Sequence, residues 1–291
     1  MKGAGVPRVA IVIPCHDDAV LLSKTLAGIA AQGDSLSDVE VIVIDNNSSV
    51  DSIEAVHRAY IDMLELTLIQ QPRLSHPFSL CRARNTALRM TEADWIVSLD
   101  ADCIPAEGYI GAVLRRIGEA GDPRIYTGER SFVSCSEISA SEILVGVPIL
   151  SGLPTVPSVS NYGLHRDRRM PGMARLPDVS HPWAFMHACS LLYQASVARR
   201  IGGHDEAFDG HWGYEDADFA YRMITTGGCE PRFAPEMRVY HQEPGDGVTG
   251  RYQYKSDKAQ NPNWTRICAE IMGFREFKRK QFQELGVTVN L

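Results

Sequence analysis

The stretch Trp95-Ile96-Val97-Ser98-Leu99-Asp100-Ala101-Asp102 decides the fold of this 291-residue chain. Residues 95–99 form a short apolar run, which is typical of a buried strand that ends at Leu99. Two carboxylates spaced by one residue just past a strand can hold one hard divalent cation together with phosphate oxygens. An Asp-X-Asp sequence is also common in turns, so its meaning depends on the rest of the chain.

Strands and helices alternate on both sides of this stretch. Apolar, β-branched runs at 9–14 and 39–44 predict strands buried on both faces, and a shorter strand is expected at 66–70. Helical spacing predicts helices over 18–32, 51–65 and 78–90. This alternation favours an α/β fold, in which a Rossmann-like, mostly parallel sheet is flanked by helices. Ligands of such sheets bind beyond the carboxyl ends of the strands, where His16-Asp17-Asp18, Asp45-Asn46-Asn47 and Asp100-Ala101-Asp102 lie.

The middle of the chain is less regular. A helix is expected over 139–147, and residues 151–182 have the composition of a long functional loop. This loop contains Arg166, Arg168 and Arg169, which form either a solvated surface or a site for a phosphorylated or carboxylated acceptor. Regular structure returns at 183–193, a helix begins near Tyr214, and the last helix is predicted over 264–285.

Composition narrows the class of protein. The formal net charge of −7 argues against a general nucleic-acid binder, which carries basic patches. No apolar run approaches the roughly 20 residues that span a bilayer, although peripheral membrane association stays open. The first residues lead into a strand rather than into a signal-peptide core, and seven scattered cysteines show no disulfide framework. We therefore expect a cytoplasmic protein.

A second acidic group lies at Trp212-Gly213-Tyr214-Glu215-Asp216-Ala217-Asp218. Acids in the first turn of a helix complement its dipole, which is a sufficient structural reason for them. The lead-in of two aromatic residues around a glycine favours a ligand site instead, because glycine lets a backbone approach a ligand closely.

Together these motifs resemble the family 2 glycosyltransferases, which have the GT-A fold. The resemblance rests on 9–16, 41–48, Ala83-Arg84-Asn85 and 95–102, while 212–216 is similar to a motif of galactosyltransferase and polypeptide N-acetylgalactosaminyltransferase relatives. It implies a hexosyl- or N-acetylhexosaminyltransferase that uses Mn²⁺ or Mg²⁺ and a UDP-sugar donor. The acceptor would be a hydroxyl group of a small molecule, glycan or peptide.

The resemblance also implies roles for individual residues. Those around the donor and the metal are Pro14, Cys15 and His16 (nucleoside), Asp45 (uracil N3–H), Arg82 or Arg84 with Asn85 (base or phosphates), Asp100 and Ala101 (ribose and metal region), and Asp102 and His241 (metal). Arg251 and Lys255, in a glycine-rich segment expected to act as a lid, would reach the diphosphate unless they belong to a solvated loop.

Asp216 occupies the position of the general base in inverting members, although Glu215 could exchange roles with it. Trp212, Gly213, Tyr214 and Asp218 would contact the acceptor. The expected division is 1–130 for the donor, 131–260 for the acceptor, catalytic helix and lid, and 261–291 for a helical segment. A retaining transferase and a catalytically silent nucleotide-sugar binder remain alternatives. A nucleotidyltransferase is disfavoured, because residues 14–18 lack its glycine-rich phosphate loop.

Overall fold

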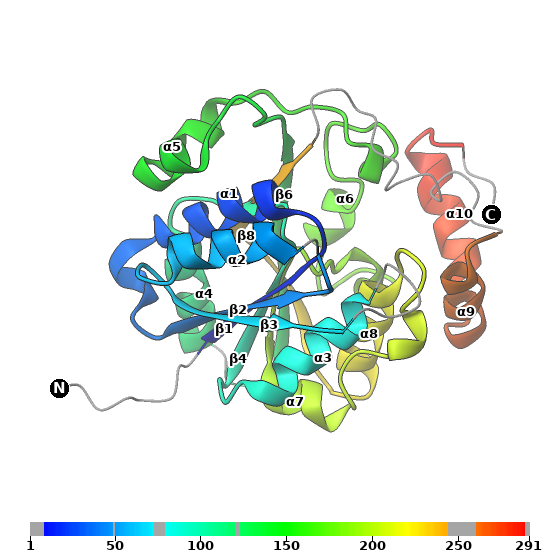
Figure 1. Cartoon of the computed structure of the whole chain (residues 1–291). Coiled ribbons are helices and arrows are strands. Elements are labelled where there is room, and N and C mark those ends of the chain that lie inside the picture. Colours follow the sequence, from blue (N-terminus) through cyan, green and yellow to red (C-terminus); the bar gives the residue numbers. More distant parts are fainter. Residues whose placement is uncertain are drawn as a thin grey trace.

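The computed structural model describes residues 9–48, 50–72, 79–119, 121, 123–243 and 260–288. One sheet crosses the middle of the molecule, and helices cover both of its faces (Figure 1). No helix in these described segments has the length and apolarity needed to cross a membrane.

The elements alternate as the sequence predicts. The strands are β1 (Val9–Cys15), β2 (Val39–Asp45), β3 (Glu65–Gln70), β4 (Trp95–Leu99), β5 (Cys103–Pro105), β6 (Arg124–Val133), β7 (Ser190–Gln194) and β8 (Glu230–Gln242). The α-helices are α1 (Ala19–Ala30), α2 (Val50–Tyr60), α3 (Leu80–Met90), α4 (Tyr109–Glu119), α5 (Ala140–Val145), α6 (Met170–Met173), α7 (Ala195–Arg200), α8 (Glu215–Thr225), α9 (Pro262–Glu270) and α10 (Phe274–Glu284). Short 3₁₀ turns lie at 33–36, 147–152, 159–161, 182–185 and 206–208.

The eight strands have the order β3-β2-β1-β4-β7-β6-β8-β5. The first four run parallel, as predicted. The second half is mixed, because β7 is antiparallel to both β4 and β6, and β5 is antiparallel to β8. β6 runs from Arg124 to Val133 and thus continues through the boundary expected after residue 130. The expected donor and acceptor halves therefore share one sheet.

The core has two sides because successive strand side chains point to opposite faces. Val9, Ile11 and Ile13 of β1 pack with the face that α1 and α4 cover. Ala10 and Val12 of the same strand pack with the face that α3, α7 and α8 cover. Burial on both faces explains why β1 reads as a continuous apolar run.

Two expectations about helices are corrected. The helix predicted over 264–285 is broken into α9 and α10. Ile271 takes an extended conformation at the end of α9, and Gly273, with the left-handed φ of +82°, is the N-cap of α10. The loop expected over 151–182 contains α6 and 3₁₀ turns, whose short runs carry no clear helical period.

Candidate active site

A cavity of about 410 Å³ lies at the carboxyl ends of β1, β2 and β4. Its walls come from the strand ends, helix α3, Arg130 of β6, the segments around residues 160–169 and 184–189, residues 212–217, and helix α10. The volume falls in the range of small-molecule sites. Residues from both acidic groups therefore meet in one place, as the sequence predicts.

Asp102 and His241 meet at one end of this cavity. Oδ2 of Asp102 lies 3.5 Å from Nε2 of His241. The sheet register explains this approach, since Cys103 of β5 is paired with His241 of β8, and the backbone N–H of Gln242 donates to the carbonyl of Asp102. An antiparallel pair of strands thus carries the second Asp of the Asp-X-Asp motif to a histidine 139 positions later.

A carboxylate holds His241 from behind. Nδ1 of His241 lies 3.0 Å from Oε1 of Glu243, which accepts a hydrogen bond from the hydroxyl of Ser158 at 2.6 Å. Burial opposes a charge on the imidazole, but Asp102 and Glu243 outweigh it, so the pKa of His241 is raised. Histidine ligands of metals have such a carboxylate behind them, because it fixes the ring and the tautomer.

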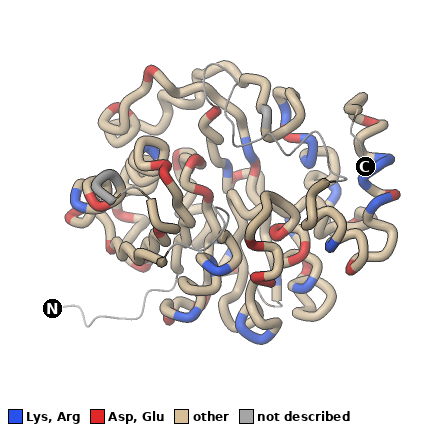
Figure 2. The backbone as a smooth tube through the Cα atoms, turned by 45° about the vertical axis from the view of Figure 1, so that its right-hand side comes forward, with Lys and Arg blue, Asp and Glu red and all other residues tan. Residues whose placement is uncertain are grey.

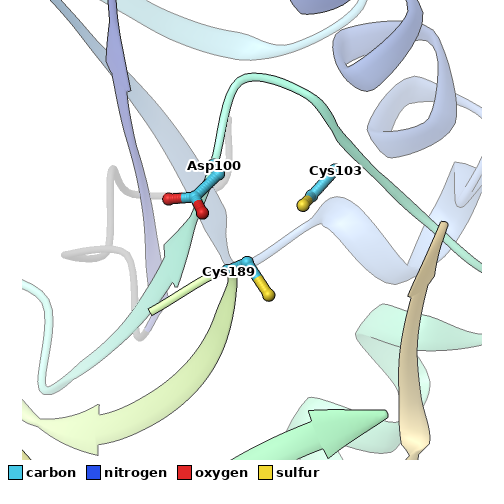
Figure 3. Close-up of side chains that lie close together, drawn as sticks. All are labelled: Asp100, Cys103 and Cys189. Carbon is cyan, nitrogen blue, oxygen red and sulfur yellow. The ribbon is translucent and has the colours of Figure 1, made fainter. Parts of the chain in front are cut away.

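The residues present fit a divalent cation. Asp102 offers oxygen from a partly buried side chain and His241 offers nitrogen from a buried one, within one cavity. Both atoms belong to the ligand types that suit Mn²⁺, and oxygen suits Mg²⁺. A second group, Asp100, Cys103 and Cys189, has ligand atoms within 4.8 Å of one another (Figure 3). Its two thiols favour softer metals, so Asp102 and His241 are the better pair for the predicted ion.

Arg84 links the two acidic groups. This side chain is 1% exposed and contacts Asp100 at 3.3 Å and Glu215 at 3.5 Å. A buried guanidinium needs carboxylate partners, because an unpaired charge in the interior is costly. Arg84 of α3 therefore ties the end of β4 to the start of α8.

The neighbouring acids Glu215 and Asp216 have different electrostatic surroundings. Burial and the charge of Asp216 raise the pKa of Glu215 to about 7, against the opposing effect of Arg84. For Asp216 burial acts in the same direction, but Arg169, together with His187 and Arg84, outweighs it and lowers the pKa. Asp216 is thus ionised at neutral pH.

The backbone before these acids is held in an unusual conformation. Tyr214 has φ 75° and Gly213 has φ 92°, so both lie in the left-handed region, which costs a tyrosine about 1–3 kcal/mol. The amide side chain of Asn263 on α9 holds this turn by donating to the carbonyls of Phe208, His211 and Gly213. Trp212, Gly213 and Tyr214 line the cavity, and their contact with the acceptor stays a prediction.

The segment that contains Arg166, Arg168 and Arg169 also reaches the cavity. Nη2 of Arg169 contacts Oδ2 of Asp216 at 3.0 Å, and the guanidinium of Arg168 lies over the ring of Tyr162 at 5.2 Å. Both arginines line the cavity, whereas Arg166 is exposed. Of these three arginines, only Arg166 therefore lies on the solvated surface.

Not every predicted residue lies at the cavity. Asn85 faces away, because its amide donates to the carbonyl of His204 and to Glu206. Asp218 pairs with Arg222 at 2.6 Å. It lies two residues along the helix from Asp216, so its side chain points to the opposite side of α8. Neither is among the cavity-lining residues, and we retain neither as a ligand contact.

The predicted nucleoside wall is partly formed as expected. Pro14, Cys15 and His16 line the cavity with Asp100 and Ala101. His16 Nδ1 donates to the carbonyl of Asn46 at 3.0 Å. Asp45 is 2% exposed and accepts a hydrogen bond from the backbone N–H of Ser48. It is not among the cavity-lining residues, so its contact with uracil stays a prediction. Arg82 does not line the cavity, and the proposed lid with Arg251 and Lys255 lies outside the described residues.

Several lining residues were not identified from the sequence: Arg130, Ser160, Tyr162, His187, Phe274 and Lys278. Tyr162 and Lys278 lie in segments whose approach to the strand ends depends on long-range packing, so no local pattern marks them. Glu243 had a usable signal, because its two-residue spacing from His241 in an extended segment places both on one side.

Comparison with known proteins agrees with this geometry. Residues 10–137 match the model of the family described as Glycosyl transferase family 2. This part of the chain is similar to a glycosyltransferase family 2 domain, and the match covers less than half of the chain. The domain contains the strand ends and the Asp-X-Asp motif, whereas Asp216 and His241 lie beyond it.

Relatives that match about four fifths of the chain include named sugar polymer synthases and glycosyltransferases. The chondroitin synthase of Pasteurella multocida (strain Pm70) is 27% identical over 244 residues, which are 81% of this chain and 25% of the relative. This chain thus spans about a quarter of that protein's length.

Solved structures share the fold. S. aureus TarS 1-349 in complex with UDP-GlcNAc gives a TM-score of 0.62 at 14% identity, covering 90% of this chain and 66% of that one. The mannosyltransferase PcManGT from Pyrobaculum calidifontis, in complex with GDP-Man and Mn²⁺, gives 0.54 at 18% identity, covering 84% and 59%. The chain therefore has the GT-A fold of glycosyltransferases, as the sequence predicts.

Proposed function

We propose that this protein transfers a sugar from a UDP-sugar to an acceptor hydroxyl with the help of Mn²⁺ or Mg²⁺, and that it inverts the anomeric centre. One observation carries this proposal: Asp102, His241, Glu215 and Asp216 line a single cavity. A silent binding module has no need for acids at both ends of its nucleotide-sugar site.

Asp102 and His241 would hold the cation next to the diphosphate of the donor. When bound, a divalent cation neutralises the negative charge that gathers on the departing diphosphate. Glu243 keeps the imidazole of His241 oriented, and Arg84 holds Asp100 beside this region.

Asp216 is the proposed general base. Its carboxylate takes the proton of the acceptor hydroxyl, while the oxygen attacks the anomeric carbon from the face opposite the diphosphate. The bond between the anomeric carbon and the diphosphate oxygen breaks, and its electron pair leaves with UDP. Glu215 is tied to Arg84 on the donor side, which makes it the less suitable base.

UDP is preferred over GDP by analogy with the TarS complex, whereas PcManGT was solved with GDP-Man. Direct comparison of UDP and GDP binding by calorimetry tests this preference. The sugar is expected to be a hexose or N-acetylhexosamine, and a panel of UDP-sugars would identify it.

The decisive experiment measures UDP release from this panel with Mn²⁺, with Mg²⁺ and with EDTA. We expect release only with a metal, and its loss in Asp102→Ala. Asp62→Ala is the matched control, because Asp62 is an exposed aspartate away from the cavity. Full turnover in EDTA, or unchanged turnover in Asp102→Ala, contradicts the proposal.

A further inference from the structure

Three arginines line the acceptor side of the cavity, but they do not have three carboxylate partners. Arg130 contacts Asp167 at 2.7 Å, and Arg169 contacts Asp216 at 3.0 Å. Across the described segments, Arg168 makes no ion pair with a carboxylate. Its guanidinium has a long 3.5 Å hydrogen bond to the side-chain oxygen of Asn161 and lies on the ring of Tyr162.

Arg168 and Arg169 also retain unused donors. The Nε atoms of both side chains are buried without a hydrogen-bond partner. Burial and the neighbouring charge of Arg169 lower the pKa of Arg168, which shows that the two cations repel each other. Two adjacent guanidinium side chains that line a cavity suit an oxyanion, because a planar fork of N–H groups matches carboxylate and phosphate.

The surroundings of these arginines suit a sugar ring. Tyr162, Trp212 and Tyr214 line the same cavity, and large aromatic rings offer flat apolar faces. Lys278 of α10 adds a further cation to this wall. Figure 2 shows that Lys and Arg positions are interspersed with Asp and Glu positions along the chain.

We propose that Arg168 and Arg169 form a subsite for an oxyanion of the acceptor, a carboxylate or a phosphate carried next to the hydroxyl that reacts. The short Arg169–Asp216 contact places this anion beside the proposed base. The acceptor is then an acidic sugar such as a uronic acid or a sugar phosphate. This inference rests on the proposed function, because it names the acceptor class of the same site.

The test compares matched pairs of ligands that differ only in the anion. Methyl β-D-glucuronide is compared with methyl β-D-glucoside, methyl galacturonide with methyl galactoside, and glucose 6-phosphate with glucose. Binding to the full chain is measured by saturation-transfer NMR, with and without UDP and Mn²⁺. We expect at least one anionic member to bind roughly tenfold or more tightly than its neutral partner, the value of a charge-assisted hydrogen bond. A preference within the uronide pairs indicates a carboxylate subsite, and a preference within the glucose 6-phosphate pair indicates a phosphate subsite.

Variants locate the anion. Arg168→Gln should remove the preference, and Arg168→Lys should restore part of it. Arg166→Gln is the matched control, because this arginine lies in the same segment but is exposed. Equal binding within every pair, no binding by any member, or an equal loss in the control overturns the inference.

Donor binding separates the two proposals. UDP affinity in Mn²⁺ is measured on the same samples, and Arg168→Gln should leave it unchanged. If UDP does not bind the wild-type protein, the proposed function fails. If UDP binds but the anion preference is absent, only the acceptor inference fails. If Arg168→Gln weakens UDP as much as the anionic ligands, the arginines serve the donor and the inference is wrong.

Discussion

At the scale of single residues, the two adjacent acids of α8 differ in what they contact. Asp216 faces Arg169, and Glu215 faces Arg84. Because neighbouring residues on a helix point in directions about 100° apart, the two acids reach different arginines, which we propose lie on the acceptor side and the donor side. The sequence predicted the pair but left their roles open, since no local pattern states which arginine each one meets.

Asp216→Asn should retain donor binding and lose transfer. The amide keeps the size of the side chain but takes no proton, so kcat should fall by roughly 10²–10⁴-fold, the usual contribution of a general base. UDP affinity from calorimetry and kcat from UDP release check this. Transfer at the wild-type rate removes Asp216 from the role of base.

The acid limb of the pH profile should distinguish the two acids. A base acts only when it is ionised. The lowered pKa of Asp216 keeps it ionised through pH 5–8, so kcat/KM should show no acid limb near neutrality. If Glu215 were the base, its pKa of about 7 would make kcat/KM fall as the pH drops below 7. Initial rates between pH 5 and 9 at subsaturating acceptor decide between them, and half-maximal activity near pH 7 would contradict the assignment to Asp216.

At the scale of elements, prediction succeeded where local pattern and burial agree. β4 has the predicted bounds because its apolar run is short and ends at an acid. The antiparallel β7 was not predicted as such, because burial on both faces gives the same apolar run in either direction. The pairing of Arg169 with Asp216 spans 47 positions, and only the folding of the irregular 158–169 segment onto the sheet brings it about.

An ion pair attaches that irregular segment to the sheet. Arg130 of β6 and Asp167 have side chains that are 9% and 0% exposed and lie 2.7 Å apart. Arg130→Met should leave Asp167 buried without this partner and lower the free energy of unfolding by about 3–5 kcal/mol. Urea unfolding followed by circular dichroism measures the change.

The neighbouring pair of Arg238 and Glu129 is the control for this variant. Its arginine side chain is 43% exposed, so Arg238→Met should cost less than about 1 kcal/mol. Equal losses in the two variants would show that the buried pair does not anchor the segment.

At the scale of the whole molecule, donor and metal should stabilise the fold together. A ligand that binds only the folded state at 100 times its Kd adds about 2.7 kcal/mol, which corresponds to a rise in Tm on the order of 5 °C. We expect this rise with UDP and Mn²⁺ together, and a much smaller one with UDP and EDTA. Scanning calorimetry of wild type, Asp102→Ala and Asp62→Ala checks it; the same rise in EDTA would argue against a shared site.

The cavity walls have separate origins along the chain. The strand ends that face the donor fall within residues 10–137, whereas Arg168, Tyr214 and Lys278 come from three later segments. If the proposed function holds, replacing these three later segments should change the acceptor more than the donor, provided that His241 of β8 is kept beside Asp102. A protein shortened to residues 10–137 would lack β7 and β8, and with them His241, so it would lose the proposed metal pair as well as the later cavity walls.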